Sequence, residues 1–227
     1  MIGKKQLIMS AGLLLGFIAP PLNATLIGAS GPLSSLGTAA SIIAAPANIL
    51  DDDIINTGMQ GFDEAQGVTT SIDYAMDGGA TLFAGSTVNS HMIFLNSDGR
   101  TDITHFGVMW RFDSVILGIM SDRNGNFEAT STGELGNPGT NYTTTFPGSG
   151  PAAPFGARGL EGGGDGYSIF DPFTLMVSMH VTEPGDWIRV ITQANSIPEP
   201  SGLVLMGLAL TALGFAVRKK KKTAIRV

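Results

Sequence analysis

The sequence predicts an all-β body, folded as an antiparallel β-sandwich of the jelly-roll type, with a helix at each end of the chain. Apolar and polar residues alternate with a period of two in several short segments, and turns rich in the chain's 31 glycines and 12 prolines separate these segments. No segment of the body shows an apolar pattern with the 3.6-residue period of a helix. Short strands at this spacing are typical of sandwiches and jelly rolls.

The first 24 residues have the pattern of a cleaved export signal. Lys4 and Lys5 precede an apolar run from Leu7 to Ala19, and Ala24 places a small residue where a cut is expected. These are the features of a secretory signal peptide, so we expect a signal helix that passes through the Sec machinery and is removed by signal peptidase after Ala24. The alternative is an uncleaved helix, but the apolar run is short for a stable membrane span.

The last thirty residues combine three different segments. Pro198-Glu199-Pro200 must be extended, because its prolines lack backbone donors and restrict the residues before them. The uncharged run Gly202 to Val217 has nearly the length that a helix needs to cross a hydrocarbon core of about 30 Å. We expect a transmembrane helix there, followed by a basic stop on its cytoplasmic side, which consists of Arg218, Lys219, Lys220, Lys221 and Lys222.

From Ile197 to Lys222 the chain resembles the PEP-CTERM proteins of Gram-negative bacteria, whose tail has a Pro-Glu-Pro motif, an apolar helix and a basic cluster in this order. The resemblance implies recognition by an exosortase, a membrane transpeptidase with a catalytic cysteine, and processing near Pro198, Glu199 and Pro200. It also implies an intermediate held in the inner membrane by the C-terminal helix, and then delivery to the cell surface or an extracellular exopolysaccharide matrix. The family's cluster is often arginine-rich, whereas this one is mostly lysine. The alternative is an ordinary single-pass anchor.

The predicted domains are the signal peptide at residues 1–24, an exported body at 25–195 and the sorting region at 196–227. The body has no lysine, and its five arginines face eighteen acidic residues, a net charge of −13. Such a surface excludes nucleic acid as a partner and suits a soluble exported protein. The chain has no cysteine, so packed apolar surface rather than disulfides must stabilise the body.

The strand predictions follow the period-two segments in order. A weak edge strand is expected near Ser41 to Ala45. A strand from Val68 to Met76 precedes a hairpin turn at Asp77-Gly78-Gly79. The apolar run Val115 to Met120 predicts a strand buried on both faces. In a further strand, Phe106, Val108, Trp110 and Phe112 are expected to face the core and to alternate with His105 and Arg111. The remaining predicted strands are Val88–Leu95, Phe173–Val181 and Trp187–Thr192.

Residues 146–166 interrupt this rhythm with a long loop rich in glycine and proline. Loops of this length in compact domains are usually functional or mobile, so this loop is where we expect any ligand of the body to bind. Arg158 and Glu161 are its charged members. A local ion pair between them is the simpler interpretation.

Two acidic segments have oxygen ligands of the kind that calcium prefers. One is Asp51-Asp52-Asp53, and the other runs from Asp122 to Glu128 around Gly125. We interpret the first as a solvated loop, because adjacent side chains point in different directions. The second lacks the spacing of a known calcium loop, and we interpret it as an Asx/Gly hairpin. Calcium is the alternative at both, and no metal or cofactor is predicted.

The candidates for catalysis or ligand binding are few. His91, His105 and His180 are predicted on the polar faces of strands, without a second metal ligand at the spacing of a zinc site. No catalytic residue is predicted, although clustering of these histidines with carboxylates in one cleft would favour a secreted hydrolase. A carbohydrate- or calcium-dependent binding module is the other alternative. The aromatic residues able to stack on sugars, with the two tryptophans also expected in the core, are Trp110, Trp187, Tyr74, Tyr142 and Tyr167.

Overall fold

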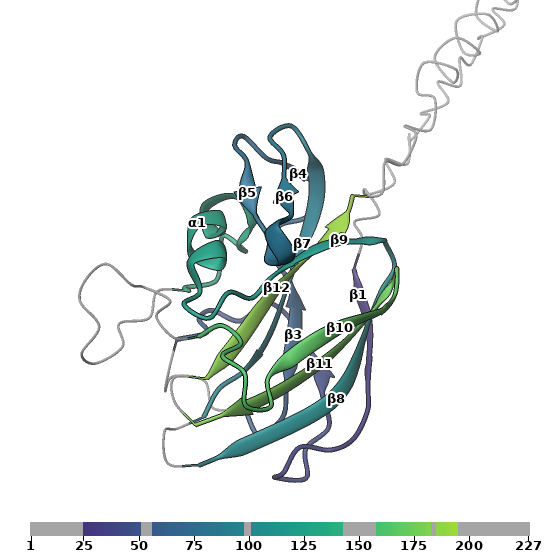
Figure 1. Ribbon diagram of the computed structural model, residues 1–227, viewed down its shortest axis with the longest axis vertical. Helices are drawn as coiled ribbons and strands as arrows, with labels where there is room; N and C mark the ends of the chain where they lie inside the picture. Colours follow the sequence, from purple (N-terminus) through teal and green to yellow (C-terminus); the bar gives the residue numbers. More distant parts are fainter. Residues whose placement is uncertain (1–24, 51–55, 98–100, 143–157, 183–184, 195–227) are drawn as a thin grey trace, which may run out of the picture.

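The computed structural model describes residues 25–50, 56–97, 101–142, 158–182 and 185–194. They form two packed, mainly antiparallel sheets, which confirms the all-β prediction (Figure 1). The first sheet has the order β1 (Leu26–Ser30), β8 (Ile103–Phe112), β11 (Thr174–Val181) and β10 (Gly166–Asp171). The second has the order β2 (Ser41–Ile42), β3 (Gln60–Asp63), β7 (Thr87–Leu95), β12 (Asp186–Gln193) and β9 (Ile116–Met120).

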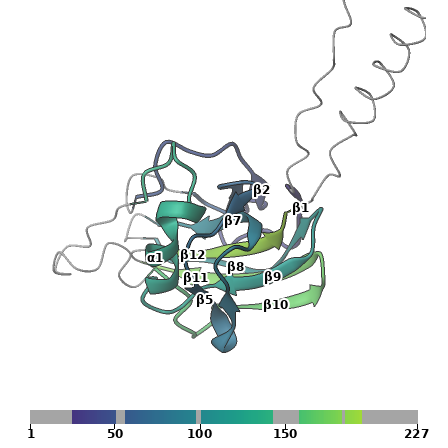
Figure 2. The same cartoon turned by 90° about the horizontal axis from the view of Figure 1, so that it is seen from above.

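Smaller elements flank the second sheet (Figure 2). The strand β4 (Val68–Thr69) pairs with β7, and β2 pairs with β3 in parallel. The predicted strand from Val68 to Met76 is therefore interrupted. Its end forms a hairpin in which β5 (Tyr74–Ala75) pairs with β6 (Thr81–Leu82) around the short helix η1 (Asp77–Gly79), which confirms the predicted turn.

The main core lies between the two sheets and is lined by side chains such as Trp110, Leu175 and Val190. A second apolar layer covers the outer face of β7 and β12, where Phe62, Phe94 and Trp187 are buried. Both tryptophans are core residues, as predicted. The strands buried on both faces are consequently β7 and β12.

The run from Val115 to Met120 contains a strand, as predicted, but this strand is not buried on both faces. These residues form β9, the edge strand of the second sheet, and Leu117 is exposed on it. A continuous apolar run identifies a strand but does not show how many strands lie beside it. The faint edge strand expected near Ser41 is present as the two-residue β2.

The predicted alternation in β8 fails before Gly107. Val108, Trp110 and Phe112 face the core as expected, but Phe106 is exposed and His105 is buried. The register explains the change, because Val108 pairs with Val177 whereas His105 pairs with Met179, so β8 has one extra residue in this interval. Gly107 has a φ of 68°, the left-handed conformation found in such β-bulges. Phe173 also departs from the pattern, because it precedes β11 and is exposed.

The helix α1 (Asn126–Leu135) was not expected, because no part of the body has a helical apolar period. Its buried positions are Glu128, Ser131 and Leu135, which have helical spacing but are mostly polar. The predicted Asx/Gly hairpin is instead the start of this helix. The backbone N–H of Phe127 donates to Asp122 Oδ1 at 2.8 Å, so this carboxylate satisfies a donor of the first turn.

Candidate functional site

The described chain enters and leaves the body at the same end, next to the turn between β8 and β9. The N–H of Asp113 in this turn donates to the carbonyl of Thr25 at 3.2 Å, and the N–H of Gln193 donates to the carbonyl of Val115 at 2.9 Å. Thr25 precedes β1, and Gln193 is the last residue of β12. Both views in Figures 1 and 2 show the start of β1 and the end of β12 close together. We call this the exit end of the body.

The strand that leads to the exit end is one of the most firmly held in the fold. β12 pairs along all eight of its residues with β7 and also pairs with β9 on its other side. Its residues from Asp186 to Thr192 are buried. A segment that continues from β12 is thus attached to the centre of the second sheet rather than to a peripheral strand.

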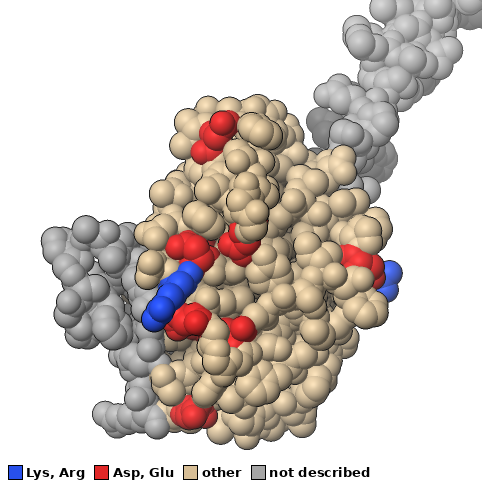
Figure 3. All heavy atoms as spheres, in the orientation of Figure 1, with Lys and Arg blue, Asp and Glu red and all other residues tan. Residues whose placement is uncertain are grey.

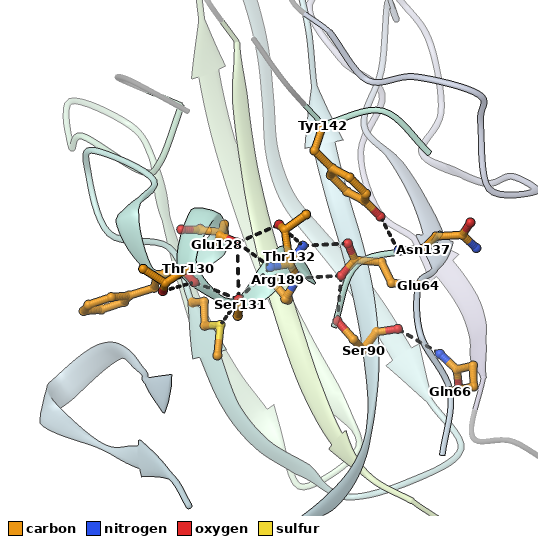
Figure 4. A network of polar contacts seen from close by, with 12 residues as sticks. Glu64, Gln66, Ser90, Glu128, Thr130, Ser131, Thr132, Asn137, Tyr142 and Arg189 are labelled. Carbon is orange, nitrogen blue, oxygen red and sulfur yellow. Dashed lines mark hydrogen bonds and ion pairs between the residues drawn. The ribbon is translucent and has the colours of Figure 1, made fainter. Parts of the chain in front are cut away.

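A polar cluster on the outer face of β12 joins α1 to the sheet (Figure 4). Arg189 of β12 donates from Nε to Glu64 Oε2 at 2.7 Å and from a terminal nitrogen to Glu64 Oε1 at 2.8 Å. Its other terminal nitrogen donates to the carbonyl of Glu128 at 2.8 Å and to Ser131 Oγ at 2.7 Å. One guanidinium therefore neutralises a buried carboxylate and binds the helix backbone at the same time.

This cluster is closed to ligands. The side chains of Arg189 and Glu64 have no exposed surface, and Glu128 and Ser131 are fully buried as well. Neither carboxyl oxygen of Glu128 is hydrogen-bonded to another described residue, and burial raises the pKa of this carboxyl well above its usual value, which favours its neutral form. A pair of glutamates beside an arginine suggests acid–base chemistry, but a substrate has no access to these atoms.

A second group of charged side chains lies where the glycine-rich loop meets the start of β12. Asp186 is 3% exposed, and its Oδ2 has no hydrogen-bond partner among the described residues. Burial, and then the charges of Asp165 and Glu161, raise the pKa of Asp186 to about 9 despite the opposing charge of Arg158. Figure 3 shows several acidic side chains around one exposed basic side chain on the face that it draws.

Arg158 itself belongs to the core. Its guanidinium carbon lies 4.2 Å from the centre of the Trp187 ring, and it donates to the carbonyl of Ile49 at 2.8 Å and to the Asn96 side chain. It is fully buried, whereas Glu161 is exposed. Of the predicted loop at 146–166, residues 146–157 lie outside the described residues.

Calcium was the alternative interpretation at two acidic segments. Asp51, Asp52 and Asp53 lie outside the described residues. At the other candidate, both carboxylate oxygens of Asp122 hold the start of α1, and Glu128 is buried within the body. Across the part of the chain that the structure describes, no group of three histidine, aspartate or glutamate side chains is arranged to hold a metal ion.

The three histidines are not brought into one cleft, and two of them are buried, contrary to prediction. His91 Nδ1 lies 2.7 Å from Asp63 Oδ1, and its Nε2 lies 3.0 Å from Thr192 Oγ1. This carboxylate–imidazole–hydroxyl order resembles a hydrolase triad, but Thr192 is fully buried and no substrate reaches its hydroxyl. His105 accepts from the N–H of Met59 at 2.9 Å, and only His180 is partly exposed.

The aromatic candidates for sugar stacking do not form an exposed platform. Trp110 and Trp187 are fully buried, and Tyr74 and Tyr142 are nearly so. Tyr167 is partly buried, and its pKa is raised by burial and by the nearby charge of Asp77. Stacking on a sugar requires an open ring face, which none of the first four provides.

A comparison with protein-family models places the remaining candidate at the C-terminus. The model described as the PEP-CTERM protein-sorting motif matches residues 196–221. The chain carries a PEP-CTERM sorting motif. The match begins two residues after Ala194, which is the last described residue of the body. Comparisons with curated proteins and with solved structures found no match.

The PEP-CTERM motif contains the predicted tripeptide Pro198, Glu199 and Pro200 and the basic residues Arg218 to Lys221, while Lys222 follows directly. These residues, the apolar run from Gly202, and Ala24 of the predicted signal peptide all lie outside the described residues. Within the described ranges, no helix has the length and apolar character needed to cross a membrane.

Sequence reasoning missed the buried roles of Arg189 and Arg158. A usable signal was present for Arg189, because it is one of only five arginines in the body and lies between Ile188 and Val190 in an apolar strand. A lone cation in such a strand indicates a buried ion pair. No comparable signal marks Glu64 as its partner, since the two residues are 125 positions apart.

Proposed function

We propose that the protein is an exported cargo of an exosortase, that its body has no catalytic activity, and that it is delivered to the cell surface or an exopolysaccharide matrix. The signal peptide carries the chain through the Sec machinery and is cut after Ala24. The run from Gly202 to Val217 then holds the chain in the inner membrane, with Arg218 to Lys222 on the cytoplasmic side. Exosortase recognises Pro198-Glu199-Pro200 and removes the tail.

The observation that carries this proposal is the PEP-CTERM motif directly after the last strand of the body. The fold supports the same assignment. The two ends of the described chain meet at one end of the body, so an export signal and a membrane tail are both attached there. The lysine-free acidic surface suits an environment outside the cytoplasm. The closed polar clusters of Arg189 and His91 support a structural rather than a catalytic body.

The direct test replaces Pro198, Glu199 and Pro200 together with alanine in cells that produce the exosortase. The matched control replaces the flanking Ser196 and Ser201 with alanine, which leaves the tripeptide intact. We expect the triple variant to be exported but to accumulate at its full, unprocessed size in the membrane fraction, while the control matures. Normal size and location of the triple variant would reject processing at this tripeptide.

A further inference from the structure

Large apolar side chains are exposed at the exit end of the body. Phe170 is 72% exposed at the end of β10, and Phe173 is 42% exposed in the turn that follows. We call the whole set the exit-end patch, and it consists of Ile27, Leu117, Ile169, Phe170 and Phe173. Scattered apolar residues on a surface need no explanation, but a group at one end of a molecule indicates a surface that is covered at some stage.

Backbone hydrogen bonds connect the patch to the point where the chain leaves the body. The N–H of Phe112 donates to the carbonyl of Phe173 at 2.9 Å, and the N–H of Ile116 donates to the carbonyl of Pro172 at 2.8 Å. The turn between these two donors also binds Thr25 and Gln193, as described above. Leu117 follows Ile116 directly, and Ile27 follows Leu26, which pairs with Phe112. The patch and both chain ends therefore surround one turn.

The short segment between Gln193 and the apolar run limits how far the exit end can be from a membrane that holds this run. Eight residues separate Gln193 from Gly202, where the apolar run begins. Fully extended, they reach about 29 Å at most. While the run from Gly202 is held in a bilayer, the exit end therefore stays within this distance of the lipid surface.

We infer that the exit-end patch docks on the lipid surface while the tail is in the membrane. This inference rests on the proposed membrane retention of the tail. Phenylalanine, isoleucine and leucine side chains partition into the headgroup and acyl boundary of a bilayer. Two acids lie beside the patch: Asp113 accepts from the N–H of Thr25 at 2.8 Å, and Asp171 accepts from the N–H of Phe173 at 2.7 Å.

Docking has a consequence for processing. It holds the body in one orientation and keeps the residues between Gln193 and Gly202 at the membrane surface. A membrane transpeptidase that acts on Pro198-Glu199-Pro200 then finds this tripeptide at a fixed distance from the membrane surface. A second copy of the chain is the other possible cover for the patch, and lipid contact is favoured because the short tail leaves from the same end.

The experiment uses the full chain reconstituted in vesicles of phosphatidylethanolamine and phosphatidylglycerol. Since the chain has no cysteine, F173C can be labelled at one position with an environment-sensitive fluorophore. The matched control is F106C, because Phe106 has a similar exposure of 45% and lies six residues from Phe112 along β8, about 20 Å from the exit end. F170C repeats the measurement at the most exposed position.

We expect lipids with a nitroxide on the acyl chain to quench the label at position 173 at least twofold more than the label at position 106. Flotation of the vesicles shows separately whether the protein is retained. Retention with equal quenching at 173, 170 and 106 would overturn the docking inference alone. Failure to float would overturn membrane retention and the docking inference together. A label at position 173 whose fluorescence changes with protein concentration, but is not quenched by the nitroxide lipid, would indicate that a second copy covers the patch. That result would overturn lipid docking.

Discussion

Arg189 and Glu64 form a two-point ion pair in the interior of the body, with N–O distances of 2.7 and 2.8 Å and no exposed side-chain surface on either residue. The pair connects the central strand β12 to β3's C-terminal side, and the same guanidinium holds the backbone of α1 through the carbonyl of Glu128. A helix whose inner face is mostly polar is thereby attached to the sheet, and Leu135 adds an apolar contact at its end.

Removal of Arg189 should destabilise the body strongly. In Arg189→Met the carboxylate of Glu64 is left buried without its partner, and breaking a buried pair in this way costs about 3–5 kcal/mol. The exposed Arg111→Met is the control, and its free energy of unfolding should change by about 0.5 kcal/mol or less. Urea unfolding measures both. Equal stability of the two variants would show that the pair does not hold α1.

Asp186 should make the body less stable as the pH rises. Its pKa is raised to about 9, so between pH 4 and 9 the folded state binds a proton that the unfolded state has lost. The contribution of this group is fully present below about pH 4 and is lost as the pH rises through the folded pKa, with a slope of up to about 1.4 kcal/mol per pH unit.

Asp186→Asn removes this proton, so its free energy of unfolding should depend less on pH across the same window. Exposed Asp171→Asn, which keeps an oxygen to accept from Phe173, should retain the slope of the parent protein. Chemical unfolding at pH 5, 7 and 9 tests this. An unchanged slope in Asp186→Asn would show that Asp186 is ionised in the folded state.

Two glycines should respond in opposite ways to alanine. Gly107 has a φ of 68° at the bulge of β8, a conformation that costs an alanine roughly 1–2 kcal/mol. Gly133 lies in the interior of α1, where an added Cβ meets nothing within 4 Å, so Gly133→Ala should stabilise the body by about 0.5–1 kcal/mol. Thermal unfolding separates the two. A stabilising Gly107→Ala would mean that β8 is paired without the bulge.

The sequence was sufficient for the sorting motif at residues 196–221 and for most strands, for physical reasons that differ. A PEP-CTERM motif is a linear signal of charge, apolar length and proline, so it is complete without the fold. The strands followed from alternation wherever one face is buried, as in β11 from Leu175 to Val181. These properties are local.

The errors arose where distant contacts decide the structure. α1 buries Glu128 and Ser131, so its inner face has no apolar period, and Arg189 compensates from another strand. His105 is buried and Phe106 is exposed, the reverse of the prediction, because the bulge at Gly107 adds one residue to β8. Which strand lies in the middle of a sheet depends on its neighbours, so the central position of β7 and β12 was not visible in their own residues.

The mass of the mature protein tests the central claim most directly. Intact-mass analysis of the protein recovered from the cell surface should show a chain that begins at Thr25 and has lost the residues from Gly202 onward. Protein from cells that lack the exosortase should also begin at Thr25 but extend to Val227. A chain found in the cytosol with residues 1–24 still attached, or a surface form that keeps its complete C-terminal tail, would contradict export followed by exosortase processing.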